Sequence, residues 1–176
     1  MLHDKVFGDI ISASIKECLT IMNIRKAEKI DIPKIINLLS QILELHAAIR
    51  PDIFASGTTK YTAEQLETIL DEKSQTICVA QDDNGDVVGH IIYSIKKQPP
   101  HNKQFDTFFI EDLCVDESAR RNHVGQALFE FAKAEAKRLN CHAISLAVWE
   151  GNDAAKAFYK KMNMKTKLTQ MEFILD

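Results

Sequence analysis

The sequence lacks the features that would indicate a membrane, secreted or nucleic-acid-binding protein. Its 176 residues contain no apolar run long enough to cross a bilayer. Charged residues such as Asp4 and Lys5 interrupt the amino terminus, so we expect no signal sequence. A formal net charge of −3 gives no general attraction to nucleic acid or to anionic lipid. We therefore expect a cytoplasmic protein that binds neither.

Cysteine is also scarce, and no two cysteines are close in the sequence. The four are Cys18, Cys78, Cys114 and Cys141, and none belongs to a C-x-x-C motif. This spacing argues against a zinc site or a disulfide framework, and it favours a reducing compartment. No metal site is predicted.

The length and composition are those of one globular domain. A chain of this size can bury a proper core. Hydrophobic content of 45% and charged content of 27% are ordinary, and the sequence has no repeat or low-complexity segment. Residues 1–21 are weakly amphipathic. They could form a helix, a tail that packs on a partner, or an overextended start before Met22. We expect an accessory extension there and a single domain over 22–176.

Apolar periodicity and turn residues predict alternating strands and helices. Strands are expected over 21–28, 76–80, 87–95, 108–115 and 143–148, with last strand material over 165–175. Helices are expected over 31–45, 62–70, 124–140 and 152–162. Asp31 is the expected N-cap of the first helix, and Asn84-Gly85 indicates a type I′ hairpin. This order predicts an α/β domain with a mixed sheet.

The strongest functional signal is a strand followed by a basic turn, a glycine and a helix start. Arg120 and Arg121 follow the strand over 108–115, and a helical pattern begins near Val124. The first turn of a helix has N–H groups without intrahelical partners, and the helix dipole adds positive potential. Gly125 lets a ligand approach the backbone closely. Such a turn suits an anion such as a pyrophosphate.

Neither standard phosphate-loop motif is present, since the chain has no G-x-x-x-x-G-K-[ST] and no G-x-G-x-x-G after a strand. Residues Arg120 to Gly125 instead resemble the coenzyme A motif Q/R-x-x-G-x-G/A of the GNAT superfamily of acetyl-CoA-dependent N-acetyltransferases. His123 stands at the first glycine. The resemblance continues through 152–164 and covers most of the chain from Met22 onward.

The resemblance implies the GNAT fold and a place for the cofactor within it. That fold has a mixed, mostly antiparallel central sheet flanked by helices. Its fourth and fifth strands, here 108–115 and 143–148, splay apart, and the pantetheine arm enters the gap. The expected pyrophosphate turn is Arg120, Arg121, His123, Gly125, Gln126 and Ala127, acting largely through backbone N–H groups. The His123 side chain either points outward or contacts a phosphate.

The end of the central strand is the expected partner of the pantetheine arm. In the family, the backbone at positions Leu113, Cys114 and Val115 pairs with the pantetheine amides and helps to polarise the thioester carbonyl. A thiol at Cys114 raises the idea of a covalent acetyl-cysteine. Apolar surroundings raise the pKa of a thiol rather than activate it, so we expect core packing at Cys114.

Residues 157–164 resemble the family segment A-x-x-F-Y-x-K-x-G-F, with Asn163-Met164 at the Gly-Phe pair. In that family the tyrosine hydroxyl lies near the CoA sulfur. A tyrosine with a pKa near 10 stays protonated at neutral pH and can donate to a thiolate, so Tyr159 is the predicted general acid. The alternative is an aromatic that packs on the sheet. Asn152 matches an asparagine that contacts the cofactor arm, and it is also a good N-cap.

A primary ammonium has a pKa near 10.4, so a base must take its proton. Glu111 and Asp112 point to opposite faces of a regular strand, so only one lines the cleft unless a bulge resets the alternation. The pair resembles that of diamine and polyamine acetyltransferases, which favours Glu111 as the base. Arg50 and Asp52 follow the first helix, where the family keeps its acceptor-binding loop, and they either pair with a charged acceptor or stay solvated. His46 is expected to face solvent.

The resemblance therefore predicts an enzyme that moves an acetyl group from acetyl-CoA to a primary amine by direct attack in a ternary complex. A small amine, polyamine-like or lysine-like, is the preferred acceptor, and a protein N-terminus or lysine is the second. A CoA-binding sensor without turnover is the alternative class. The missing first glycine supports that alternative, whereas Glu111 and Tyr159 oppose it. Homodimers are common among such domains, and nothing in the sequence identifies an interface.

Overall fold

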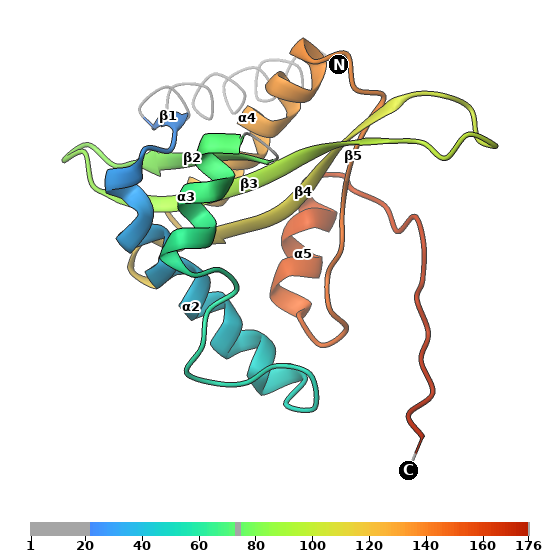
Figure 1. Cartoon of the computed structure of the whole chain (residues 1–176), viewed down its shortest axis with the longest axis horizontal. Coiled ribbons are helices and arrows are strands. Elements are labelled where there is room, and N and C mark those ends of the chain that lie inside the picture. Colours follow the sequence, from blue (N-terminus) through green and yellow to red (C-terminus); the bar gives the residue numbers. More distant parts are fainter. Residues whose placement is uncertain (1–21, 73–74, 176) are drawn as a thin grey trace, which may run out of the picture.

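A computed structural model describes residues 22–72 and 75–175 of the chain, so the expected extension over 1–21 lies outside the described residues. Five described strands form one sheet in sequence order (Figure 1). They are β1 (Asn23–Lys26), β2 (Thr76–Gln81), β3 (Val87–Lys97), β4 (Asp106–Val115) and β5 (Ala143–Leu146). Neighbours are antiparallel except β4 and β5, which are parallel. The predicted mixed, mostly antiparallel sheet is confirmed.

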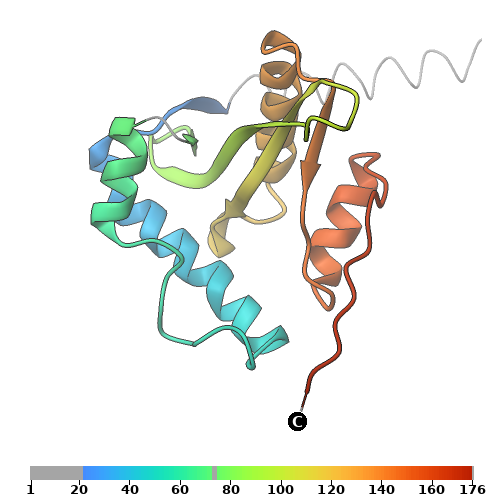
Figure 2. The same ribbon diagram turned by 45° about the vertical axis from the view of Figure 1, so that its right-hand side comes forward.

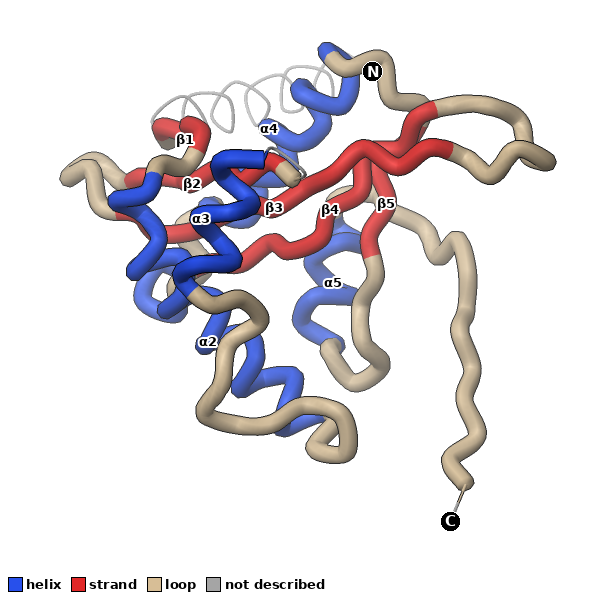
Figure 3. Tube along the Cα trace, viewed as in Figure 1, coloured by secondary structure: helices blue, strands red, loops and turns tan. Residues whose placement is uncertain are grey.

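Helices cover both faces of the sheet (Figure 3). The α-helices of the described part are α2 (Ile32–Ile49), α3 (Ala63–Glu72), α4 (Val124–Arg138) and α5 (Asp153–Lys161). Side chains of α2 and α3 share one core with the sheet, and those of α4 and α5 share the other. Within 22–72 and 75–175, no helix has the length and apolar character that crossing a membrane requires.

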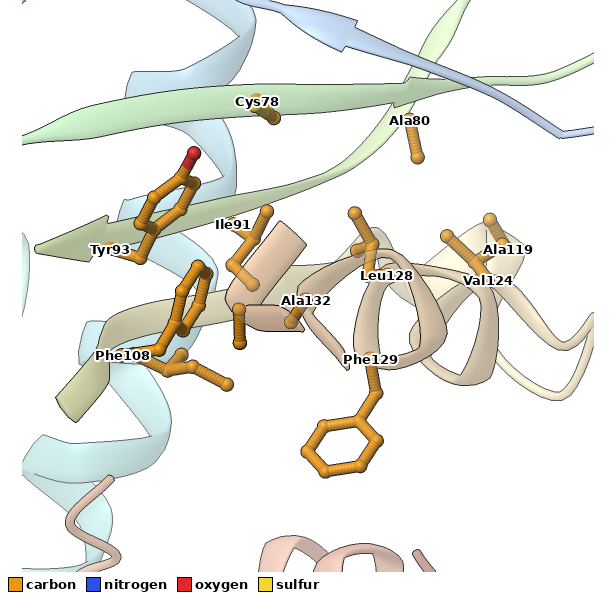
Figure 4. Packing of buried hydrophobic residues seen from close by; sticks show 12 residues of the cluster. Cys78, Ala80, Ile91, Tyr93, Phe108, Ala119, Val124, Leu128, Phe129 and Ala132 are labelled. Atoms are coloured by element: carbon orange, nitrogen blue, oxygen red, sulfur yellow. The ribbon is translucent and has the colours of Figure 1, made fainter. Parts of the chain in front are cut away.

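The alternation of strand side chains divides the core into two clusters. On the α4 side, the rings of Tyr93 and Phe108 stack at 4.2 Å between centroids, and Leu128 of α4 packs in the same cluster (Figure 4). On the α2 side, Ile92 of β3 packs with Leu39 of α2. The sheet is thus buried on both faces, which explains why its central strands are rich in apolar residues.

The turn between β2 and β3 differs from the predicted type I′ hairpin. Only Gly85 has a positive φ in this turn, at +85°, whereas a type I′ turn needs a positive φ at Asn84 as well. The carbonyl of Asp82 accepts the Gly85 N–H, and the Asp82 carboxylate accepts the N–H groups of Asn84 and Asp86. These bonds favour a type I turn closed by a glycine bulge.

Asp31 precedes α2 as expected, but its side chain does not cap the helix. Its carboxylate is only 5% exposed and accepts two hydrogen bonds from Arg25, at 2.7 and 3.0 Å. It also accepts the backbone N–H of Glu28 at 2.8 Å. The carboxylate therefore ties β1 to the turn before α2, because a guanidinium is a stronger partner than a helix N–H.

The strand predicted over 165–175 does not form. This segment, named the tail below, is extended and has no secondary structure. It leaves the end of α5 (Figure 1), and its residue Glu172 pairs with Arg50, which directly follows α2. Its apolar residues suit a strand, but a strand also needs a neighbour to supply its ladder hydrogen bonds.

Candidate active site

The sheet opens between β4 and β5. Parallel pairing runs from Thr107–Ala143 to Ile110–Leu146, where β5 ends, whereas β4 continues to Val115 (Figure 2). Residues 111–115 therefore have β3 on one side and no strand on the other within the described chain. The predicted splay is confirmed. Its open edge presents backbone amide groups that an extended, amide-bearing ligand can pair with.

A β-bulge lies at the point where the strands part. Ile92 pairs with Asp112 and Tyr93 pairs with Ile110, so Glu111 is the extra residue of β4. The bulge breaks the alternation expected for a regular strand, and both acids reach the α2 side of the sheet. Asp112 contacts His90 and Glu111 contacts Ser94, two β3 residues in alternation with Ile92 of the α2-side core. Both carboxylates therefore lie beside the splay.

Each carboxylate already has a cationic neighbour. Glu111 accepts hydrogen bonds from Ser94 Oγ at 2.7 Å and pairs with Lys96 Nζ at 2.8 Å. Burial acts to raise the pKa of Glu111, but the bonds from Lys96 and Ser94 outweigh it, and the pKa is lowered overall. Glu111 is therefore ionised at neutral pH.

Asp112 forms a buried pair with His90. The two side chains meet at 2.9 Å, and Lys60 Nζ lies 3.7 Å from the other carboxylate oxygen. Burial acts to raise the pKa of Asp112, but the hydrogen bond with His90 and the charge of Lys60 lower it overall. Lys60 also donates to the Glu111 carbonyl at 2.9 Å, so it joins the loop before α3 to the bulge. Sequence reasoning missed both His90 and Lys60.

The basic turn precedes α4 and has an unusual backbone. Arg121 and His123 both adopt left-handed conformations, with φ of 67° and 60°. His123 is the N-cap residue of α4 but makes no side-chain cap, so the first N–H groups of the helix have no capping side chain. His123 therefore stands, in place of the first glycine of the family motif, at a position where glycine would be the least strained residue.

One predicted donor of this turn is not available. The N–H of Ala127 donates to the carbonyl of His123 at 2.9 Å, and Ala127 is buried. Ala127 stays a predicted member of the pyrophosphate turn, but its N–H group already makes the first hydrogen bond of α4. Arg120, Arg121 and His123 are exposed, and the backbone at Gly125 and Gln126 belongs to the first turn of α4.

Tyr159 lies on α5, on the α4 side of the sheet. Its ring packs against Phe129 of α4 and Phe158, with centroids 6.1 and 5.0 Å away. Burial, and then the charge of Asp112, raise the pKa of Tyr159 well above its ordinary value. Tyr159 is thus protonated at neutral pH. Both interpretations of this residue, an acid and a packing aromatic, are compatible with this position.

A profile of the acetyltransferase (GNAT) family matches residues 39–164, which include the splay, the basic turn and α5. The chain belongs to this family. A mutant BH1408 protein from Bacillus halodurans is similar in structure, with a TM-score of 0.82 and 30% identity over 87% of this chain and 99% of that one. Glucosamine-6-phosphate N-acetyltransferase from Arabidopsis thaliana has a TM-score of 0.64 and 26% identity over 88% and 99%.

A sequence relative is an uncharacterised N-acetyltransferase in the pepI 3′ region of Lactobacillus delbrueckii subsp. lactis. It is 26% identical over 92 residues, which are 52% of this chain and 53% of that protein. The chain spans about half the length of this curated relative. The relationship therefore supports the family.

In this GNAT chain, Cys114 and Asn152 both have structural roles. The Cys114 thiol is buried and contacts the carbonyl of Leu38 at 3.2 Å. Burial, with a further contribution from Asp112, raises its pKa to about 12, which opposes an acetyl-cysteine intermediate. Asn152 Oδ1 accepts the Ala155 N–H at 3.1 Å and so caps α5. The cap and the core packing were both expected.

An aromatic row joins the end of α2 to the segment after β5. The rings of His46 and Phe54 lie 5.2 Å apart, and Phe54 meets Trp149 edge-on at 5.2 Å. Burial lowers the pKa of His46, although the charge of Asp112 opposes this effect. The expectation that His46 faces solvent is therefore wrong. Trp149, the single tryptophan, directly follows the strand predicted over 143–148, and it was the signal that could have identified this row.

Arg50 and Asp52 bind each other. The guanidinium donates two hydrogen bonds to the Asp52 carboxylate, at 2.9 and 2.6 Å, and pairs with Glu172 of the tail. Its carbon Cζ lies 5.7 Å from the ring centre of Trp149. Both side chains thus already have charged partners, and a charged acceptor would have to compete with them.

We expect His123→Gly to leave the affinity for CoA equal or improved. The substitution relieves a left-handed conformation that costs a residue with a side chain about 1–2 kcal/mol. The greater conformational entropy of glycine in the unfolded chain offsets part of this gain in folding stability. Isothermal titration with CoA measures the affinity, and His123→Ala removes the ring without relieving the backbone. A large loss of affinity in both variants would mean that the imidazole contacts the ligand.

Proposed function

We propose that this protein transfers an acetyl group from acetyl-CoA to a primary amine by direct attack in a ternary complex. The observation that carries the proposal is the splay of a GNAT sheet directly upstream of the basic turn. The open edge of 111–115 and the uncapped start of α4 suit the two ends of one ligand, namely an amide-bearing arm and a pyrophosphate.

The residues of this chain fit acetyl-CoA as follows. Backbone groups of Leu113, Cys114 and Val115 pair with the pantetheine amides. The pyrophosphate lies against N–H groups of the α4 start, at Gly125 and Gln126. The cofactor site also includes the side chains of Arg120, Arg121, His123 and Asn152. The bound cofactor supplies an activated thioester.

The reaction needs three proton transfers. Glu111 first takes one proton of the ammonium, directly or through water. The amine nitrogen then attacks the acetyl carbon, and the C–S bond breaks to release a thiolate. Tyr159 gives that sulfur its proton, which its raised pKa keeps in place at neutral pH. The attacking nitrogen loses its second proton to water as the amide forms, and solvent restores the proton of Tyr159.

We expect Glu111→Gln to lower kcat/KM by about 10²-fold. The lowered pKa of Glu111 means that the base form is present at neutral pH and is lost only as the pH falls through that lowered pKa. On the acid side, kcat/KM of the wild type should therefore stay constant as the pH falls through the neutral range. Rates measured from pH 5 to 9 in wild type and Glu111→Gln provide the test.

His46 is the competing base, and the same profile distinguishes it. Its imidazole is half-buried, the charge of Asp112 acts to raise its pKa, and no carboxylate of the described residues is hydrogen-bonded to it. A histidine base must be neutral, so activity would fall as the pH drops through the pKa of His46. A flat profile with a slow Glu111→Gln supports Glu111. A sloping profile that disappears in His46→Gln, with near-normal Glu111→Gln rates, would transfer the role to His46.

The preferred acceptor is a small amine, polyamine-like or lysine-like. Two ionised carboxylates beside the splay favour a cationic acceptor, and an incoming ammonium would replace Lys60 or Lys96 as their partner. The Arabidopsis relative is named for a small amine substrate, which agrees with this class. A protein N-terminus or lysine is the second class of acceptor.

The deciding experiment is titration of the full chain with acetyl-CoA, followed by a free-thiol assay across small amines and peptides. Binding with amine-dependent CoA release would establish the transferase and its acceptor class. Binding without release in any amine would favour the sensor alternative. The absence of binding would overturn the cofactor site itself.

A further inference from the structure

A lysine of this chain already lies where the acceptor amine is expected. Lys60 belongs to the loop between α2 and α3, and its nitrogen Nζ donates to the carbonyl of Glu111 at 2.9 Å. The same nitrogen lies 3.7 Å from the Asp112 carboxylate. Glu111 directly follows the last β4 residue that pairs with β5. A primary amine of the chain is therefore held at the opening of the sheet, beside Asp112.

The loop that carries Lys60 is anchored at both ends. On the side of α2, the Glu44 carboxylate accepts the Gly57 N–H at 2.6 Å. On the side of α3, the Thr62 N–H donates to Gln65 Oε1 at 2.8 Å, and the Gln65 N–H donates to Thr62 Oγ1 at 3.3 Å. This reciprocal pair fixes the backbone just after Lys60. The fold thus determines where the amine lies, while the stem of the lysine remains flexible.

The position of Lys60 differs from that of Lys96, the other lysine that contacts the bulge. Lys96 pairs with the Glu111 carboxylate at 2.8 Å, but its backbone lies opposite Thr107, which is still paired with β5. Lys60 instead bonds to the main chain where β4 has no second neighbour within the described chain. Because the open edge of 111–115 is the proposed place of the acyl donor, Lys60 is the lysine that can reach it.

We propose that the chain acetylates its own Lys60, so that this side chain is an acceptor in cis; the inference rests on the proposed transferase activity. Nζ forms a bond to the acetyl carbon as the C–S bond breaks, and CoA leaves as a thiol with the proton of Tyr159. The ammonium gives up two protons, one to Glu111 and one to water. An amine already held at the site reacts without the entropy cost of binding from solvent. The product amide is neutral, so Lys60 no longer acts as a cation beside Asp112.

Peptide mass spectrometry of the full chain, incubated with acetyl-CoA and no added amine, tests the proposal. We expect acetylation of Lys60 to proceed more than about tenfold faster than that of Lys97. Lys97 is the internal reference for uncatalysed acetylation, because its side chain is 77% exposed. Lys60→Arg keeps the positive charge and should remove the fast phase of acetyl incorporation. Circular dichroism should show equal folding of this variant and the wild type.

Two further measurements distinguish transfer by the site from chemical acetylation and from transfer between chains. Tyr159→Phe should slow the modification of Lys60 by about tenfold and leave that of Lys97 unchanged. The rate constant at Lys60 should not depend on protein concentration, because transfer in cis is a first-order process. Equal rates at Lys60 and Lys97, acetyl on Lys96 in place of Lys60, or a rate constant that rises with protein concentration would each overturn the proposal.

A free-thiol assay with added small amines separates this inference from the proposed function. Amine-dependent release of CoA, with Lys60 unmodified in the absence of amine, would overturn the inference alone. The absence of both reactions would overturn the transferase activity as well.

Discussion

Tyr159→Phe is expected to lower kcat by more than about tenfold and to leave the KM for acetyl-CoA nearly unchanged. The substitution removes one oxygen atom and retains the ring that packs against Phe129 and Phe158. If Tyr159 protonates the departing thiolate, the loss falls on the chemical step, because the thiolate then leaves without a proton donor. Initial rates with varied acetyl-CoA measure both constants.

A second tyrosine provides the control for this substitution. Tyr93 is buried on β3, and its hydroxyl donates to Glu135 of α4 at 3.1 Å. Tyr93→Phe should therefore lower stability by about 1 kcal/mol and leave kcat near that of wild type. Wild-type turnover in Tyr159→Phe would remove the acid role and leave only the packing interpretation. An equal loss of kcat in both variants would indicate a general effect on folding.

Gly89→Ala is expected to destabilise the fold by about 1–3 kcal/mol, the usual cost of overpacking. Gly89 of β3 pairs with Val115 of β4, under the start of α4. An added Cβ would lie 2.9 Å from the carbonyl oxygen of Cys114 and 3.2 Å from both Leu128 and Val124. The sheet and α4 would have to move apart, because the closest atom belongs to the backbone.

Thermal unfolding measures this effect, with an expected fall in Tm of roughly 2–4 °C for each kcal/mol. Gly125→Ala is the matched control, since its Cβ would meet the ring of Phe158 at 3.5 Å and Val115 at 3.6 Å, which are ordinary contacts. Alanine also has the higher helix propensity, so Gly125→Ala should keep or raise Tm. An unchanged Tm in Gly89→Ala would show that α4 can shift without cost.

The bulge at Glu111 could not be predicted from the sequence. Strand residues near 108–115 were recognisable from composition, and so was the presence of an acid pair. Whether one or both acids lie beside the splay depends on the register between β3 and β4, and a single inserted residue changes it. That register is set by pairing with residues about 20 positions away and by packing against two helices, so the local pattern cannot reveal it.

The contact partners of charged and aromatic side chains could not be predicted from the sequence either. Lys60 reaches the bulge from a loop 51 positions away, and Trp149 meets Phe54 across the end of the sheet. Asp31 bonds to Arg25 rather than to the helix that follows it. Each choice follows from the distance between side chains in the folded chain, since a charged or aromatic group binds the strongest partner within reach.

The sequence by itself determined the family, the strand-turn-helix at Arg120 to Val124, and the periodicity of the helices, because these depend on neighbouring residues. It also placed Tyr159 and Asn152 on and before one helix. Only the tertiary structure decided that Glu111 and Asp112 share a face, that the N–H of Ala127 is already bonded, and that no strand of the described residues lies beside the tail. A strand exists only with a partner, and pairing is a property of the folded chain.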